Sequence, residues 1–132
     1  MLGSRYIILG EEFANATFAP FNKKASRLLV TMGGEDDNNC TPFILESIDQ
    51  IENMQIIVVA GPLFKNIHDI ETAASKCKSD VQIFRSPNNL VEVFTSCDIE
   101  ISAAGTTTYE LCSLGIPTIL VQQADNQQMI CN

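Results

Sequence analysis

The stretch from 101 to 111, with the sequence ISAAGTTTYEL, concentrates residue types that can bind an anion. Small side chains before Gly105 let a ligand approach the backbone closely. A helix that begins just after Gly105 would carry N–H groups without intrahelical acceptors, and its dipole adds positive character there. Further hydroxyl donors come from Thr106, Thr107 and Thr108. We therefore expect a cradle for a diphosphate that uses no Lys or Arg.

Glu110 allows two interpretations. With Thr107 it matches a capping box, in which the two side chains satisfy the helix N-terminus reciprocally. That role is structural and would leave the carboxylate less free to hold a ribose. Taken from these residues alone, both interpretations stay open.

Two more loops offer binding chemistry. The pair Gly33-Gly34 suits a tight turn or a loop that accepts a ligand close to its backbone. A second loop combines carboxylate and amide groups, which suit sugar hydroxyls but also the polar start of a helix. It consists of Asp125, Asn126, Gln127 and Gln128. The acidic run 35–37 is expected to be a solvated loop. Neither G-x-G-x-x-G nor a P-loop occurs, which disfavours NAD and ATP as ligands.

Composition excludes several classes of function. The formal charge of −8 and the eight unclustered Lys and Arg residues argue against nucleic-acid binding. Five cysteines without a C-x-x-C pair predict neither a zinc site nor a disulfide framework. Cys97 and Cys112 lie in apolar stretches and are expected to be buried. His68 is the only histidine, so a His-rich metal site is excluded. We expect no metal, no cofactor and no catalytic residue in the chain.

The segment 1–9 is too short and too soon followed by Glu11-Glu12 to be a signal peptide. No apolar stretch approaches the roughly 20 residues of a membrane span. We therefore expect no membrane span and a cytoplasmic protein.

Short apolar runs alternate with helical periodicity from residue 27 onward. Strands are predicted at 27–32, 56–60, 81–84, 98–102 and 118–121. Helices are predicted from Thr41-Pro42, over 67–76, around 90–97, over 107–114 and from about Asn126. Strands that are apolar throughout predict a parallel sheet covered on both faces, hence an α/β, doubly wound, Rossmann-like domain. Ligands of such sheets bind at the carboxyl ends of the strands, where the loops described above lie.

Both ends of the chain resemble cuts through a longer protein. Residues 1–26 show no clear periodicity and are interpreted as an interdomain connecting segment. Residues 27–132 are interpreted as the binding domain, truncated in its last helix.

The loop motifs together resemble the C-terminal donor-binding domain of GT-B-fold sugar enzymes of the glycosyltransferase family 28 type. Within that type, the likeness is to the UDP-sugar hydrolases of spore coat polysaccharide and pseudaminic-acid biosynthesis (PseG-like). It covers roughly residues 5–132 and is most specific over 101–111, Leu114–Thr118 and Asp125–Gln128.

The resemblance implies a role for each loop. Gly105–Thr108 would contact the diphosphate and Glu110 the ribose. Gln127 and Gln128 would meet the sugar, and the backbone from Ser86 to Asn89 would contact the uracil. Gly33-Gly34 resembles the family's glycine loop, although Glu35 stands where relatives usually carry Ser or Thr.

The function implied is a UDP-sugar-binding domain of a GT-B-type sugar hydrolase or glycosyltransferase in cell-surface polysaccharide biosynthesis. In the family, the general base and the acceptor site belong largely to the N-terminal domain. We therefore expect this domain to be inactive without its N-terminal half. The alternative is a non-catalytic donor-binding subunit that pairs with a separate catalytic chain.

Overall fold

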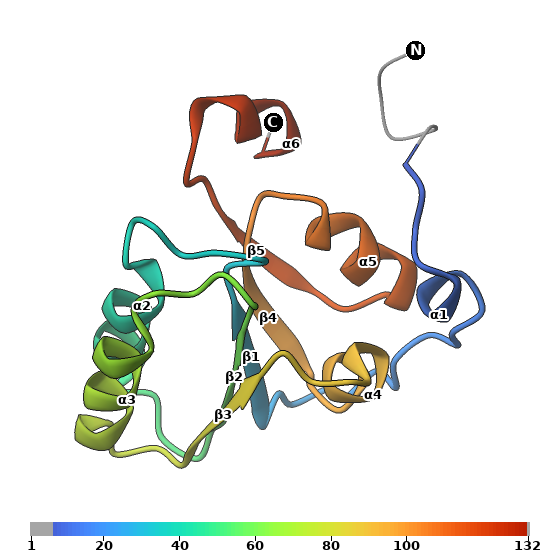
Figure 1. The fold of residues 1–132 in the computed structure, drawn as a ribbon. Coiled ribbons are helices and arrows are strands. Elements are labelled where there is room, and N and C mark those ends of the chain that lie inside the picture. The colour runs from blue at the N-terminus through green and yellow to red at the C-terminus, as the bar shows by residue number, and fades with distance from the viewer. Residues whose placement is uncertain (1–6, 132) are drawn as a thin grey trace.

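Five apolar runs form one parallel sheet in the computed structural model, which describes residues 7–131 (Figure 1). The strands are β1 (Arg27–Thr31), β2 (Gln55–Ala60), β3 (Val81–Arg85), β4 (Ile99–Ala103) and β5 (Thr118–Val121). Their order across the sheet is β3-β2-β1-β4-β5, and every neighbouring pair is parallel. The predicted Rossmann-like α/β class is therefore confirmed, and the predicted strands agree with the observed ones to within one residue at each end.

Helices cover both faces of the sheet, as Figure 1 shows. They are α1 (Glu11–Ala14), α2 (Cys40–Ile48), α3 (Ile67–Lys76), α4 (Leu90–Thr95), α5 (Thr107–Leu114), the 3-10 helix η2 (Asp125–Gln127) and α6 (Gln128–Cys131). Helices α2 and α3 lie on one face, and α1, α4 and α5 lie on the other. No helix in residues 7–131 is long and apolar enough to cross a membrane.

Strand β1 shows why the sheet needs apolar residues at consecutive positions. Successive side chains of a strand point to opposite faces. Leu28 and Val30 pack into the core under α2 and α3, while Leu29 packs into the core under α4 and α5. Because both faces are covered, neither set of positions can be polar without a partner.

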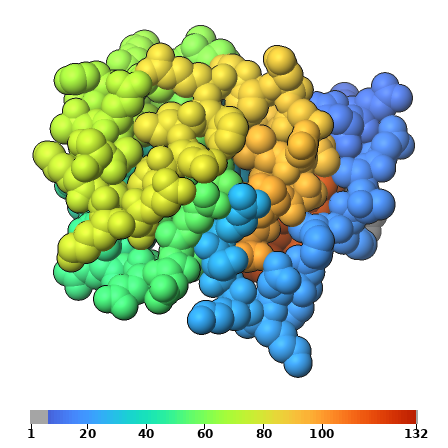
Figure 2. Space-filling view, turned by 90° about the horizontal axis from the view of Figure 1, so that it is seen from below, coloured from blue at the N-terminus to red at the C-terminus, as the bar shows by residue number. Residues whose placement is uncertain are grey.

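The first segment of the chain contributes to the core, although the sequence predicted only a connection there. Phe13 on α1 is 2% exposed, and its ring centroid lies 6.1 Å from that of Phe94 on α4. The chain then runs below the sheet, where residues near 22–26 lie beside the start of β4 (Figure 2). Asp98 fixes that segment by accepting hydrogen bonds from Asn22 and Ser26.

Cysteine burial agrees with the prediction in part. Cys97 is buried among the side chains under α4 and α5, with 3% of its surface exposed. Cys112, which was expected to be buried, is exposed. It lies on the outer side of α5, whose buried residues are Thr108, Leu111 and Leu114. The apolar residues around Cys112 in the sequence therefore do not predict which face of α5 it occupies.

The strand order creates a crevice between β1 and β4. The chain moves from β1 toward β2 on one side and from β4 toward β5 on the other, so the loops after β1 and β4 diverge. In open parallel sheets, such a switch point is the usual place for a ligand, outside the carboxyl ends of the strands. The loops at 32–39 and 104–106 flank this crevice.

Candidate functional site

Two cavities lie side by side at the carboxyl edge of the sheet, above the switch point. We call the larger, of about 470 Å³, the polar cavity and the smaller, of about 290 Å³, the apolar cavity. Gly33, Gly34 and Thr107 line both cavities and so form their common wall. The polar cavity is also lined by Met32, Glu35, Asp37, Asn38, Leu63, Ala103, Gly105, Thr106, Gln123, Ala124, Asn126 and Gln127. The apolar cavity is also lined by Thr31, Val59, Ala60, Gly61, Pro62, Ser86, Pro87, Leu90, Phe94 and Glu110.

The N-terminus of α5 forms part of the common wall. Thr106 is the N-cap residue, and no side chain caps the helix there. Thr107 is the first helical residue and not the N-cap, so the capping box between Thr107 and Glu110, one of the two interpretations of Glu110, is not formed. Among the described residues, the backbone N–H groups of Thr106 and Thr107 have no acceptor. They are therefore available to an anion at the positive end of the helix dipole.

Two residues of the expected diphosphate cradle are already engaged within the fold. The N–H of Gly105 donates to the Ala103 carbonyl at 2.8 Å. Thr108 is 7% exposed, and its hydroxyl donates to the same carbonyl at 3.4 Å. Thr108 lines neither cavity, so its side chain supports the loop from within.

Glycines leave open space on the cavity side of two loops. A Cβ added at Gly34 or at Gly105 would meet no atom within 4 Å. Gly33 adopts a positive φ of 79°, a conformation that favours glycine, and its N–H donates to the Thr31 hydroxyl at 3.3 Å. These positions let a ligand come close to the backbone.

Gly61 has a different role, because a Cβ there would collide with backbone. It would lie against the carbonyl of Gly33 and 2.6 Å from the carbonyl oxygen of Gly34. The Gly34 carbonyl also accepts a hydrogen bond from Leu63 N–H at 3.1 Å. The loop after β2 thus packs directly on the glycine loop after β1, a contact that sequence analysis missed.

Glu110 is the acidic group of the apolar cavity. Burial raises the pKa of the Glu110 carboxyl, the nearby Glu12 raises it further, and a hydrogen bond from the Thr107 hydroxyl partly offsets both effects. The wall also includes the apolar side chains of Pro87, Leu90 and Phe94. Such a wall can hold a flat apolar ring, while Glu110 can accept hydrogen bonds from hydroxyl groups.

Ser86 lines the apolar cavity. Its backbone has a positive φ of 43°, and its N–H donates to the Ala60 carbonyl at 3.0 Å. This turn directs the chain from β3 toward α4 and places Ser86 and Pro87 at the cavity.

The loop after β5 contributes two of its four expected residues. Asn126 and Gln127 line the polar cavity, whereas Asp125 and Gln128 are exposed and line neither cavity. Gln123, which lies in the same predicted loop, also lines the polar cavity. Neighbouring side chains in the 3-10 helix η2 point in different directions, and this explains why only some residues of the loop line the cavity.

The acidic run after the glycine loop is not wholly solvated, and the prediction is wrong for Asp36. That side chain is only 4% exposed and accepts hydrogen bonds from the N–H groups of Cys40 and Thr41, each at 2.8 Å. It also accepts a bond from Asn66 at 3.1 Å. Asp36 thus caps α2 and connects two loops of the carboxyl edge, while its neighbours Glu35 and Asp37 are exposed.

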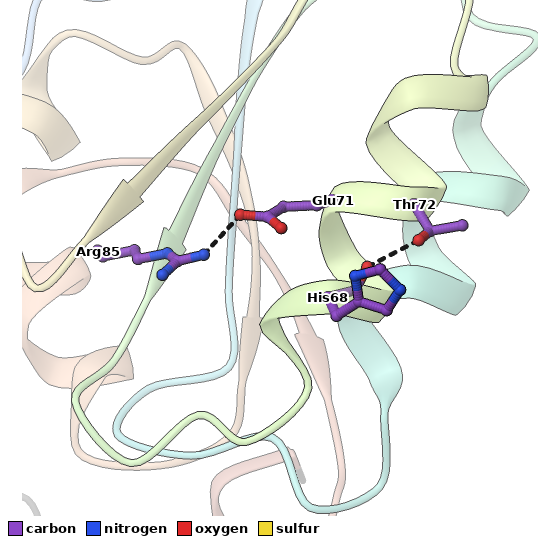
Figure 3. Close-up of polar contacts among 4 residues, drawn as sticks. All are labelled: His68, Glu71, Thr72 and Arg85. Atoms are coloured by element: carbon purple, nitrogen blue, oxygen red, sulfur yellow. Dashed lines mark hydrogen bonds and ion pairs between the residues drawn. The ribbon is translucent and has the colours of Figure 1, made fainter.

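Basic side chains lie outside the site. None of the described residues that line the two cavities is Lys or Arg. Arg85, at the end of β3, instead pairs with Glu71 of α3 at 2.5 Å (Figure 3). His68 is exposed on α3, where its backbone carbonyl accepts a bond from the Thr72 hydroxyl (Figure 3). An anion bound at the common wall would therefore depend on backbone groups and hydroxyls.

No group of three or more His, Cys, Asp or Glu side chains within residues 7–131 has an arrangement suited to a metal ion.

Comparison with known proteins gives three relatives in sequence, and no protein-family model matches the chain. An uncharacterized protein of Methanocaldococcus jannaschii is 29% identical over 96% of this chain and 28% of its own length. The spore coat polysaccharide biosynthesis protein SpsG of Bacillus subtilis is 25% identical over 95% of the chain and 38% of its own length. A pseudaminic acid cytidylyltransferase and UDP-2,4-diacetamido-2,4,6-trideoxy-beta-L-altropyranose hydrolase of Helicobacter pylori is 29% identical over 82% of the chain and 19% of its own length.

A solved structure extends the comparison to the fold. The glycosyltransferase SnogD from Streptomyces nogalater matches 94% of this chain and 31% of its own length, with a TM-score of 0.55 and 16% identity. The chain thus spans between about a fifth and two fifths of the length of each of these four proteins. Its five-stranded parallel sheet with flanking helices therefore shares an α/β, Rossmann-like fold with part of that GT-B-type structure.

Proposed function

We propose that this chain is the UDP-sugar-binding domain of a GT-B-type sugar hydrolase or glycosyltransferase in cell-surface polysaccharide biosynthesis. The observation that carries the proposal is the common wall of the two cavities. There Thr107 lies between the two cavities and Thr106 borders the polar one, and the backbone N–H groups of both residues have no acceptor in the part of the chain that the structure describes. A nucleotide sugar has the same sequence of parts, namely a flat base with a ribose, a diphosphate and a polyhydroxylated ring.

Each part of the ligand is assigned to a group of residues. The uracil enters the apolar cavity beside Pro87 and Leu90, close to the backbone at Ser86. Glu110 accepts hydrogen bonds from the ribose hydroxyls. The diphosphate meets the α5 N-terminus and the open backbone at Gly34 and Gly105. The sugar occupies the polar cavity against Asn126 and Gln127.

The reaction itself requires groups from a second domain or a partner chain in this proposal. The matched proteins are each more than twice as long as this chain, which leaves room for a catalytic half. In hydrolysis, the acceptor at the anomeric carbon is water, and in transfer it is a hydroxyl or amine of another molecule. UDP leaves in both cases, so the binding half described here serves either reaction.

The name of the Helicobacter pylori relative supports the hydrolase form, and that of SnogD the transferase form. The name of SpsG supports a role in polysaccharide biosynthesis. The name of the Helicobacter pylori relative and the two-cavity geometry both support a nucleotide sugar as the ligand.

Titration of the ¹⁵N-labelled chain with UDP, UMP and AMP tests the binding role. A few charge-assisted N–H bonds of about 1.5–3 kcal/mol each must offset the cost of association. We therefore expect affinity near the millimolar range, or about −4 kcal/mol. UDP should shift the amide signals of 105–110 most, and AMP should shift them least. The proposal fails if millimolar UDP leaves these signals unmoved or shifts signals evenly over the chain.

A paired substitution sharpens the test. Thr107→Val removes the hydroxyl at the common wall but keeps the size of the side chain, whereas Thr72→Val makes the same change on exposed α3. Weaker UDP binding is expected for the first variant alone. Equal affinities in the two variants would place the ligand elsewhere.

A further inference from the structure

Asp36 is buried beside the polar cavity without lining it. Its sequence neighbours Glu35, Asp37 and Asn38 all line that cavity, whereas Asp36 lines neither cavity and is only 4% exposed. Its carboxylate can therefore influence a ligand only through the residues that it holds in place.

The Asp36 carboxylate attaches the end of the glycine loop to α2. Its Oδ1 accepts a hydrogen bond from the Cys40 N–H and its Oδ2 accepts one from the Thr41 N–H, each at 2.8 Å. Asp36 follows Gly34 by two residues, and β1 ends shortly before the glycine pair. The glycine loop is thus held by the sheet at one end and by this carboxylate at the other.

The same carboxylate also contacts the loops after β2 and β5. Its Oδ2 accepts a second bond from Asn66 Nδ2 at 3.1 Å, and its Oδ1 lies 3.5 Å from Nε2 of Gln123. Asn66 is the N-cap residue of α3, at the end of the loop after β2. In that loop the Leu63 N–H donates to the Gly34 carbonyl at 3.1 Å. Donors from α2 and from two further loops therefore meet on one buried side chain.

We propose that Asp36 is a positioning residue for the diphosphate. By joining the glycine loop to α2 and to the loop after β2, it keeps the open backbone at Gly34 in place opposite the N-terminus of α5. Each of its partners is a donor, so the position requires a group that only accepts, as an ionised carboxylate does. Binding residues are held in a productive geometry by supporting hydrogen bonds of this kind. The inference rests on the proposed function, because it concerns the diphosphate of the same ligand.

A matched pair of variants tests the positioning role. In Asp36→Asn, one carboxylate oxygen becomes an NH₂ group that faces other donors, so the glycine loop must shift. Asp98→Asn makes the same change in a carboxylate that also accepts several hydrogen bonds, but it lies at the other edge of the sheet and lines neither cavity. The affinities of the wild-type chain and of both variants for UDP and for UMP are measured by NMR titration.

We expect the preference for UDP over UMP to fall by about fivefold or more in Asp36→Asn, which corresponds to the net contribution of one hydrogen bond. It should keep the wild-type value in Asp98→Asn. UMP affinity should change little in both, since Asp36 does not hold the residues proposed for the base and the ribose. Equal weakening of UDP and UMP in Asp36→Asn would reduce Asp36 to a general structural role, and an unchanged preference would overturn the inference. A wild-type chain that binds neither nucleotide would instead refute the proposed function on which the inference rests.

A second variant keeps the attachment to α2 and removes the link to the loop after β2. Asn66→Ala deletes the bonds from Asn66 to Asp36 and to Asn39, and the Asn66 side chain makes no capping bond to α3 that would be lost. Without any ligand, hydrogen exchange of the Leu63 amide should accelerate by about tenfold or more in Asn66→Ala and in Asp36→Asn, while exchange in β1 stays unchanged. Leu63 exchange at the wild-type rate in both variants would show that Asp36 does not hold the glycine loop.

Discussion

Asp98 and Arg27 exchange hydrogen bonds at the amino-terminal edge of the sheet. The Asp98 N–H donates to the Arg27 carbonyl and the Arg27 N–H donates to the Asp98 carboxylate, both at 2.9 Å. The same carboxylate accepts from Ser26 and from Asn22. One side chain therefore joins the start of β4 to the start of β1 and to the segment that follows α1, on the side seen in Figure 2.

Asp98→Asn should lower the free energy of unfolding by about 1–3 kcal/mol at pH 7, because bonds to a charged acceptor are lost. Glu52→Gln removes one charge from an exposed side chain and is the control. Urea denaturation of both variants gives the two values. Similar losses in both would show that the Asp98 hydrogen bonds contribute little.

The same carboxylate predicts a loss of stability in acid. Partial burial pushes the pKa of Asp98 upward, but its bonds with Asn22, Ser26 and Arg27 outweigh burial and lower the pKa to about 2. A lowered folded-state pKa stabilises the fold above the unfolded value of about 3.9 and ceases to do so as the pH falls toward 2. Denaturation curves of wild type and Asp98→Asn should therefore converge between about pH 4 and pH 2. A difference in stability between the two proteins that stays constant over this range would contradict the lowered pKa of Asp98.

Glu100 predicts the opposite dependence on pH. It lies in β4 between Leu29 and Thr118 of the neighbouring strands, it is fully buried, and neither carboxyl oxygen has a partner among the described residues. Burial, with a smaller effect from Glu110, raises the pKa of Glu100 well above its ordinary value. The neutral acid fits the fold, so stability is greatest below the unfolded value of about 4.3 and falls as the pH rises toward the raised pKa.

Two substitutions at this position separate burial from titration. Glu100→Leu should stabilise the chain at pH 7 by about 1–3 kcal/mol, because it removes unsatisfied polar atoms from the core. In Glu100→Gln the side chain cannot ionise, so the change in stability that Glu100 causes between pH 5 and pH 8 should disappear. Urea denaturation at both pH values gives the comparison. A steeper pH dependence in Glu100→Gln than in wild type would refute the explanation.

Three of the glycines at the carboxyl edge should respond differently to alanine. Gly34→Ala and Gly105→Ala add a methyl group to open space and should change stability by less than about 1 kcal/mol. Both should weaken UDP binding about tenfold, because the methyl group occupies the place proposed for the diphosphate. Gly61→Ala should instead cost about 1–3 kcal/mol, since its methyl group would overlap the backbone of Gly33 and Gly34. Thermal unfolding and UDP titration distinguish the two behaviours, and a Gly34→Ala chain that binds UDP normally would oppose the assignment.

Glu110 gives the proposed site its own pH dependence. Ribose hydroxyls donate to the ionised carboxylate, so UDP binding should strengthen as the pH rises through the raised pKa of Glu110. Glu12→Gln removes one of the two causes of that shift and should move the midpoint to lower pH. Affinities measured across pH 4–8 for both proteins test this, and 2′-deoxy-UDP should show a weaker dependence than UDP. If the pH midpoints of UDP binding were identical in the two proteins, Glu12 would not influence the pKa of Glu110.

Local patterns predicted most of the fold. The run TTYELCSL with a following glycine predicted α5 over 107–114, and the apolar run TILV predicted β5. The expected loops do meet at one edge, because parallel strands bring their carboxyl ends together. What failed were positions whose surroundings come from distant sequence. Asp36 looked solvated because its partners Asn66 and Gln123 are 30 and 87 positions away.

The remaining differences have local causes of other kinds. Helix α1 has four residues, too few to show a period, so Phe13 gave no sign of its place in the core. Glu100 was not singled out from the sequence, because its burial depends on helices that cover both faces of the sheet. In the loop after β5, composition identified the polar group but could not tell that Asn126 and Gln127 face the cavity while Asp125 and Gln128 do not.

The proposed site has no lysine or arginine among its described lining residues, and the chain has a formal charge of −8, so ionic strength should influence anion binding in the reverse of the usual way. Long-range repulsion opposes the arrival of a dianion, and the attraction from amide dipoles acts only at short range. Added neutral salt screens the former more than the latter. Association with an anionic ligand should therefore be faster at physiological ionic strength than in dilute buffer. For a phosphate-rich competitor, its charge should contribute less to affinity than its shape does.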